Sequence, residues 1–370
     1  MKLVVTKTNL KNCLKVIEGV VKTDANLSIL KNVLIDADGD EIKLISTNLE
    51  IAITSVLNGK ILEKGKTTVL FDAFFNIINN LQLERLNLNL IDSKIELITD
   101  NYSAILNTQP VDEFPIIPKI KNNKEFIEIK GGILKEAINQ IISSAQTTET
   151  RPELNSVLFL FNIENIKLTT TDGIRLSEKT IPNTQFESNF ENKFNILIPL
   201  KTINELNKIL NEDDVLKIFI DENQILFKTQ RFELISRLTS GSFPDYEAVV
   251  PKEFKTEIIL NKEELISAIK LTSIFTNKTM GINIKTNINK KIIEIFSQNQ
   301  TIGENKYILQ SKIKGEEKEI IFNWKYLLDG LKNIKTEEVF LGLNEENKPA
   351  LIKAPGDNYY FYILMPILSV

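Results

Sequence analysis

The sequence predicts an α+β fold of three repeated domains, each with two helices packed on antiparallel sheet. An extended apolar stretch followed by an amphipathic helix occurs three times, and its anchors Leu10, Leu134 and Leu265 lie 124 and 131 residues apart. A second element of the same kind recurs in phase with the first. Its anchors, 127 and 124 residues apart, are Phe71, Ile198 and Phe322.

The order within each copy follows from the periodicity of its apolar residues. Leu10, Leu14 and Ile17 have the spacing of one buried helix face, and so do Leu327 and Leu331. Alternating segments separated by turn residues predict antiparallel strands between the two helices. These strands are expected at 32–37, 41–46 and 51–57 in the first copy, and at 156–161, 165–170 and 175–180 in the second.

Two proline-containing segments divide the chain into its copies. Residues 114–124 and 243–255 both begin with Phe-Pro, and each precedes the next repeat. Proline ends strands and suits linkers, so we place the domain boundaries there. The expected domains are 1–123, 124–252 and 253–370.

The composition excludes several classes of protein. The 370 residues contain no histidine and one cysteine, which rules out an internal disulfide, a His-dependent triad and an ordinary zinc site. No glycine-rich phosphate loop is present. We therefore expect no catalytic residue, no metal and no cofactor. One enzymatic alternative is carboxylate chemistry by Asp172 with Arg175, and it lacks a second positioned group.

The composition also bears on the cellular compartment of the protein. A single cysteine and the lack of any apolar run of about 18 residues indicate a cytoplasmic protein without a membrane span.

Five sequence runs resemble the bacterial DNA polymerase sliding clamp family, the DNA polymerase III beta subunits. They follow in the family's order and spacing over the whole chain. The runs are ETRPELNSVLF, KLTTTDGIRLSEK, SGSFPDYEAVVP, IIFNWKYLLDGL and FYILMPI.

The resemblance implies a DNA clamp fold and a head-to-tail homodimer whose six domains form a ring around duplex DNA. Such a ring is a processivity factor in DNA replication, and it tethers the replicative polymerase, the clamp loader and other clamp-binding proteins. The alternative is a monomeric repeat scaffold that binds peptides without encircling DNA.

A ring that slides along DNA must be attracted to the phosphates without reading the base sequence. Because the net charge is −4, basic residues must be concentrated on the helices that face the hole. The candidate DNA-facing residues are Lys11, Lys15, Lys22, Lys135, Lys201, Lys208, Lys325 and Lys332. The candidate dimer-interface residues are Ile274, Phe275 and Leu106.

The resemblance also implies a groove for partner peptides between the second and third copies. Aliphatic and methionine side chains there would form an adaptable apolar pocket. The candidate groove residues are Leu154, Thr171, Gly173, Arg175, Leu176, Pro244, Val249, Asn323, Tyr326, Ile363, Met365, Pro366 and Ile367.

This chain departs from the family's pattern at several of these places. Ile174 stands where the family has histidine, Ala248 where arginine is frequent, and Leu368 where the family's terminal run has arginine. The groove is therefore expected to be more apolar and less basic. In the first copy Asp24 replaces an arginine, with Lys22 nearby.

Overall fold

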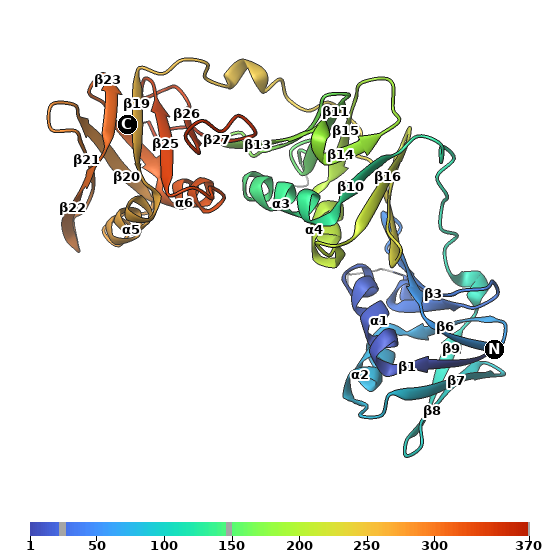
Figure 1. The fold of residues 1–370 in the computed structure, drawn as a ribbon. Coiled ribbons are helices and arrows are strands. Elements are labelled where there is room, and N and C mark those ends of the chain that lie inside the picture. Colours follow the sequence, from blue (N-terminus) through green and yellow to red (C-terminus); the bar gives the residue numbers. More distant parts are fainter. Residues whose placement is uncertain (22–26, 146–149, 369–370) are drawn as a thin grey trace. The chain divides into compact units, whose positions relative to one another are not determined.

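The computed structural model describes residues 1–21, 27–145 and 150–368 (Figure 1). The chain forms two compact units. The first unit contains Met1–Lys135, Thr184–Glu191 and Lys201–Leu238, and the second contains Glu136–Asn183, Asn192–Leu200 and Thr239–Val370.

The first unit is built on one antiparallel sheet of fourteen strands. The sheet curves back, because β4 and β5 are joined only by Asn58 yet lie far apart in the strand order. In that order the strands are β14 (Phe186–Ser188), β10 (Ile127–Lys130), β16 (Val215–Asp221), β17 (Gln224–Lys228), β18 (Phe232–Arg237), β4 (Ile51–Leu57), β3 (Ile42–Thr47), β2 (Asn32–Asp36), β6 (Lys66–Leu70), β9 (Ser103–Gln109), β8 (Lys94–Ile98), β7 (Arg85–Ile91), β1 (Lys2–Thr6) and β5 (Gly59–Glu63).

The second unit contains two antiparallel sheets. The nine strands of the larger sheet are, in order, β15 (Phe194–Pro199), β11 (Ser156–Asn162), β12 (Asn165–Thr171), β13 (Arg175–Pro182), β27 (Tyr360–Leu364), β26 (Ala350–Lys353), β25 (Glu338–Leu343), β19 (Thr256–Asn261) and β23 (Lys312–Gly315). The four of the smaller sheet are β22 (Gly303–Gln310), β21 (Ile292–Asn299), β20 (Gly281–Asn287) and β24 (Glu319–Asn323).

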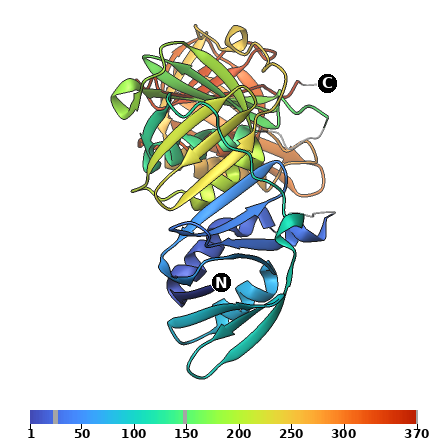
Figure 2. The same ribbon diagram turned by 90° about the vertical axis from the view of Figure 1, so that its right-hand side faces the viewer.

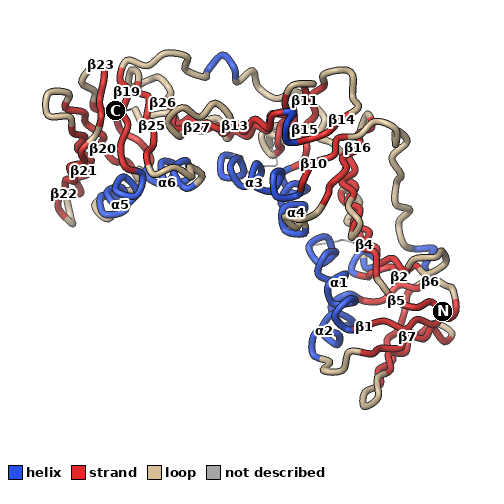
Figure 3. The backbone as a smooth tube through the Cα atoms, in the orientation of Figure 1, coloured by secondary structure: helices blue, strands red, loops and turns tan. Residues whose placement is uncertain are grey.

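The helices pack against these sheets through one apolar face each. In α1, Leu10, Leu14 and Ile17 are fully buried, which confirms the helix face expected from their spacing. Figure 3 shows α5 and α6 side by side along the strands of the second unit, and Figure 2 shows the first unit from a second direction. The α-helices are α1 (Lys7–Val21), α2 (Phe71–Asn80), α3 (Gly131–Ile141), α4 (Leu200–Ile209), α5 (Lys262–Ser273) and α6 (Trp324–Lys332).

The threefold repeat is present as the sequence predicts. Each copy opens with a strand that leads into a helix, as β1–α1, β10–α3 and β19–α5. A second such pair follows in each copy, as β6–α2, β15–α4 and β24–α6. The expected strands of copies one and two are confirmed within two residues, as β2 to β4 and β11 to β13. Short 3₁₀ turns connect other segments, at Ser28–Lys31, Val111–Glu113, Ile142–Ser144, Asn183–Gln185 and Glu247–Val249.

The middle copy divides its strands between the two units. Its strands β10 and β16 to β18 join the first unit's sheet because β18 pairs with β4. Its strands β11 to β13 join the second unit's sheet because β13 pairs with β27. The domain boundaries at 123/124 and 252/253 stay a prediction. In the part of the chain that the structure describes, no helix is both long and apolar enough to cross a membrane.

A partly buried ion pair in the first unit makes its stability depend on pH. Asp214 receives hydrogen bonds from the Arg231 guanidinium (2.5 and 3.0 Å) and from the Asn211 backbone N–H (2.8 Å). Partial burial acts to raise the pKa of Asp214, but the bonds from Arg231 and Asn211 outweigh it and lower that pKa.

Because the pKa of Asp214 is lower when folded, the carboxylate stabilises the native state above the unfolded pKa. That contribution is lost as the pH falls through the folded value. We expect Asp214→Asn to lower the free energy of unfolding by about 1–3 kcal/mol at pH 7 and by less near pH 3. Urea unfolding at both pH values measures this. An equal loss at both would show that the charge is not responsible.

Candidate functional site

A tight turn between β12 and β13 begins the candidate site, and we call it the groove turn (Thr171–Arg175). The Thr171 hydroxyl donates to the Arg175 carbonyl (2.8 Å) and accepts from the Gly173 N–H (3.1 Å). The Asp172 carboxylate accepts from the N–H groups of Ile174 (2.9 Å) and Arg175 (2.8 Å). Gly173 has φ of +87°, which suits glycine. The turn is thus held rigidly with the Ile174 side chain 49% exposed.

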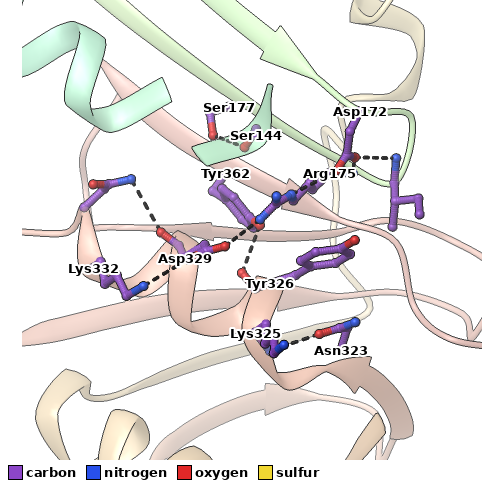
Figure 4. A network of polar contacts seen from close by, with 12 residues as sticks. Ser144, Asp172, Arg175, Ser177, Asn323, Lys325, Tyr326, Asp329, Lys332 and Tyr362 are labelled. Atoms are coloured by element: carbon purple, nitrogen blue, oxygen red, sulfur yellow. Dashed lines mark hydrogen bonds and ion pairs between the residues drawn. The ribbon is translucent and has the colours of Figure 1, made fainter. Parts of the chain in front are cut away.

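Arg175 is the centre of a polar network in the second unit (Figure 4). Its guanidinium donates to Asp172 (2.9 Å) and to Asp329 of α6 (2.6 Å). It also lies over the Tyr326 ring, 4.2 Å from the ring centroid. Burial acts to lower the pKa of Arg175, but the Tyr362 hydroxyl and the two carboxylates raise it above its ordinary value. Arg175 therefore stays charged, and both carboxylates have a counter-ion.

The C-terminal strand ends beside the groove turn. β27 pairs with β13, and the Met365 N–H then donates to the Ile174 carbonyl (2.9 Å). Two residues later the Ile367 N–H donates to the Ile321 carbonyl of β24 (2.8 Å). Met365, Pro366 and Ile367 are half-buried, so this tail forms a partly accessible apolar edge.

The segment that begins with the second Phe-Pro is fixed by a buried acid. The Tyr246 hydroxyl donates to the Glu178 carboxylate (2.5 Å), which also pairs with Lys167 (3.4 Å). Tyr246 packs in a small cluster with Leu176 and Ile363. This anchor leaves Pro244 and Val249 exposed at the surface of the second unit.

Most of the predicted groove residues lie in neighbouring elements of the second unit. Not all of them are at the surface. Leu154, Leu176 and Ile363 are at most 4% exposed, so they support the site from the core. Asn323 is the N-cap of α6 and accepts from the Lys325 N–H (3.0 Å). The sequence analysis had instead predicted that the Asn323 side chain binds a partner peptide.

Two residues of the site were missed. Asp329 follows Tyr326 by three residues on the same helix, so the helical spacing could have found it. Ile174 was noted as a departure but was not counted as a groove residue, although it is exposed beside the tail.

The predicted DNA-facing lysines differ in their exposure and in whether their ammonium groups already have a partner. Lys135 donates to the Leu210 carbonyl (2.9 Å), which ties its ammonium to the end of α4. Lys208 pairs with Glu205 (2.7 Å), Lys332 with Asp329 (3.0 Å) and Lys201 with Glu50 (4.0 Å). Lys15 and Lys325 are exposed and Lys11 is half-buried, whereas Lys22 lies outside the described residues.

A hollow of about 830 Å³ in the first unit gathers some of these charges. It lies between α1 and α4, and its basic side chains are Lys15, Lys208 and Arg231. Glu18 and Glu205 also line it. Lys208 is bonded to Glu205 and Arg231 is paired with Asp214, so three basic side chains and two acidic ones share this hollow.

Two strand edges carry exposed apolar side chains. In the described residues β22 pairs only with β21, and Ile302 and Ile308 at this edge are 58% and 52% exposed. Ile274 is 60% exposed, and the Phe275 ring approaches Gly303 at the start of β22. In the first unit, residues 103–107 of β9 pair only with β8 among the residues that the structure describes. Here Ile105 is 63% exposed, and the predicted Leu106 is half-buried.

Three family models match the chain in succession. They describe the N-terminal domain (residues 1–118), the central domain (128–245) and the C-terminal domain (247–368) of the DNA polymerase III beta subunit.

Curated relatives and solved structures agree with these matches. The beta sliding clamp of Staphylococcus aureus is 30% identical over 97% of this chain and 96% of its own length. That of Bacillus subtilis is 28% identical over 99% of both chains. The crystal structure of the Bacillus subtilis DNA polymerase sliding clamp superposes with a TM-score of 0.94 at 26% identity and covers 100% of both chains. The chain therefore belongs to the DNA polymerase III beta subunit family, the beta sliding clamps.

Proposed function

We propose that this chain forms a head-to-tail dimeric ring that encircles duplex DNA and tethers the replicative polymerase during DNA replication. The observation that carries the proposal is the match of all three family domains, in order, to the whole chain. The clamp loader and other clamp-binding proteins are its further partners. It works in the cytoplasm, has no catalytic role and needs no cofactor.

Asp172 supports a role without catalysis. Its carboxylate accepts from two backbone N–H groups and from the Arg175 side chain. A carboxylate with these partners holds the groove turn in shape. It is poorly placed to act as a general base, because three of its roughly four acceptor sites are occupied and one of the donors is the Arg175 cation.

The dimer is proposed to join the two exposed strand edges. An edge strand offers unpaired N–H and C=O groups to another strand. We place the β22 edge of one chain against residues 103–107 of β9 in its partner. Ile274, Phe275 and Leu106 would supply apolar contact beside the paired strands, and we add Ile105 and Ile308 because both are exposed at these edges.

The lysines provide attraction to DNA without base readout. Of the predicted set, Lys15, Lys201, Lys208, Lys325 and Lys332 are exposed residues on helices. We retain all of these except Lys201, whose side chain is less exposed (45%) than those of Lys208 (65%) and Lys332 (66%). Lys201 and Lys11 are secondary candidates. Lys135 is weaker, because it is bonded to Leu210.

The groove is proposed to capture a peptide of each partner protein. The groove turn, the 365–367 tail and the exposed Pro244 and Val249 form an apolar surface around the Arg175 network. We expect a single groove of this kind to bind a partner's peptide with about micromolar affinity, which allows partners to exchange.

Replacing Ile174 tests this groove without disturbing the backbone. We expect Ile174→Asp to weaken binding of the organism's replicative polymerase subunit at least about tenfold, because an acid replaces an exposed apolar contact beside Asp172 and the C-terminal tail. Deletion of residues 365–370 should have the same effect. Fluorescence anisotropy with the labelled polymerase subunit measures both.

The matched control is Ile163→Asp, which changes a 59% exposed isoleucine in the β11–β12 turn. It should bind like the unchanged chain. Normal binding by both the Ile174 variant and the deletion would refute the groove.

A further inference from the structure

The groove turn has a structural copy in the first unit, between β3 and β4. The Thr47 hydroxyl donates to the Ile51 carbonyl (3.0 Å) and accepts from the Leu49 N–H (3.0 Å). The Asn48 side chain accepts from the N–H groups of Glu50 (3.1 Å) and Ile51 (2.8 Å). Each of these four bonds has its counterpart in the groove turn, at the same position.

The segments around this copy repeat as well. At the end of β18, the Arg237 N–H donates to the Glu50 carbonyl (3.1 Å), as the Met365 N–H does to the Ile174 carbonyl. The Phe-Pro segment of the first linker (114–115) corresponds to that of the second. The whole backbone frame of the candidate groove is thus present twice, once in each unit.

The repeated frame encloses a hollow of about 300 Å³ in the first unit. Its rim carries two aliphatic side chains that are poorly covered, Leu49 at 50% and Ile116 at 96% exposure. The lining has one acidic residue, Glu50, and one basic residue, Arg237. The apolar residues that line the hollow are Leu49, Ile51, Ala52, Pro115, Ile116, Pro118 and Ile235.

Leu49 is held in a conformation that does not suit leucine. Its φ is +75°, in the left-handed region, and the corresponding residue of the groove turn is Gly173. A half-exposed leucine gains little from packing that would offset this strain. Strained residues of this kind concentrate at functional sites, and here the strain presents an aliphatic side chain at the mouth of the hollow.

The charge of the hollow identifies the kind of ligand. Glu50 is paired with Lys201 (4.0 Å). Arg237 is exposed, and within residues 1–21, 27–145 and 150–368 its guanidinium makes no ion pair. The hollow therefore has an uncompensated positive charge beside aliphatic side chains, which complements a carboxylate next to aliphatic residues.

We propose that this hollow is a second peptide-binding groove, which takes an extended segment with aliphatic residues next to an acidic one. The inference rests on the proposed function, since the frame that it repeats is that of the candidate groove. The lining differs, because Arg175 and its two carboxylates are replaced by Ile51 and the unpaired Arg237. The two grooves would thus select different segments.

Separate labels in the two grooves test the proposal. One variant has Gln224→Cys, at the lining of the second groove, and another has Ala248→Cys beside Val249. Each is labelled with a trifluoroethyl thiol reagent, and the native Cys13 is buried and 7% exposed. The probe is the peptide acetyl-Leu-Asp-Leu-Leu-amide, with acetyl-Leu-Lys-Leu-Leu-amide as its control.

We expect a saturable ¹⁹F shift of the label at 224 with a Kd of about 1 mM or tighter. Adding Arg237→Glu should weaken it at least about tenfold, as should the change to the lysine peptide. Adding Leu49→Gly should weaken binding while thermal stability is retained or raised, because glycine accepts the positive φ.

The outcomes separate the two grooves. A shift at 224 without one at 248 supports the second groove and counts against the proposed one. A shift at 248 alone overturns the second groove, and so does the absence of both shifts. Binding at 224 that is unaffected by Arg237→Glu also overturns it as stated.

Discussion

Replacing Ile274 with aspartate should convert the dimer into a monomer. Ile274 is 60% exposed and lies beside the free edge of β22. Burying an isoleucine side chain contributes about 1.5–3 kcal/mol, and an unpaired carboxylate in its place adds a desolvation cost. Together these predict a dimer Kd raised at least about 100-fold.

Sedimentation equilibrium at micromolar concentration measures the change. The unchanged chain should have a mass near twice 42.2 kDa, and the variant a mass near 42.2 kDa. Ile163→Asp is the control, because it changes an equally exposed isoleucine in a turn of another sheet. If the Ile274 variant remains a dimer, the interface is elsewhere. If the unchanged chain is a monomer, the alternative of a monomeric scaffold is favoured.

Reversing four helix lysines together should strongly reduce binding to DNA. Each lysine that neutralises a phosphate adds about 0.9 to the dependence of log K on log salt. We expect the quadruple variant Lys15→Glu, Lys208→Glu, Lys325→Glu and Lys332→Glu to bind DNA at least about tenfold more weakly at low salt. Its salt dependence should be flatter.

The control for this experiment reverses four exposed lysines on strands and turns. These are Lys60, Lys94, Lys290 and Lys348. This control has the same net charge as the quadruple variant. A difference in DNA binding between the two therefore shows that the position of the lysines matters. Equal loss in both would show that DNA responds only to total charge, and unchanged binding in the helix variant would refute the assignment.

The repeat and its elements could be predicted from the sequence because they are local. The spacing of Leu10, Leu14 and Ile17 reports a buried helix face, and alternation reports strands, without reference to the rest of the chain. The turn residues between the strands expected at 165–170 and 175–180 likewise predicted a turn, which the structure confirms between β12 and β13.

The division of the middle copy between two sheets was not predictable in this way. It depends on β18 pairing with β4 and β13 with β27, across more than 170 residues. An apolar pattern shows that a face is buried but not which strand covers its edge.

The side-chain partners at the site were hidden for a related reason. The sequence identified Arg175 and Asn323 as polar groups free to bind a peptide. In the structure Arg175 is paired with Asp172 and Asp329, and Asn323 caps α6. Polar side chains near a surface form hydrogen bonds with one another before a ligand binds. Which partners they find depends on the residues that the tertiary fold brings close to them.

The central claim is that the chain encircles DNA, and retention on circular DNA tests it most directly. The chain is loaded onto a nicked circular plasmid by its clamp loader with ATP, and the complex is passed over a sizing column at 0.5 M NaCl. A topological link does not depend on phosphate contacts, so we predict that the chain elutes with the circle and is released when the plasmid is cut once. Equal retention on circular and cut plasmid, or loss from the circle by salt alone, would contradict the ring.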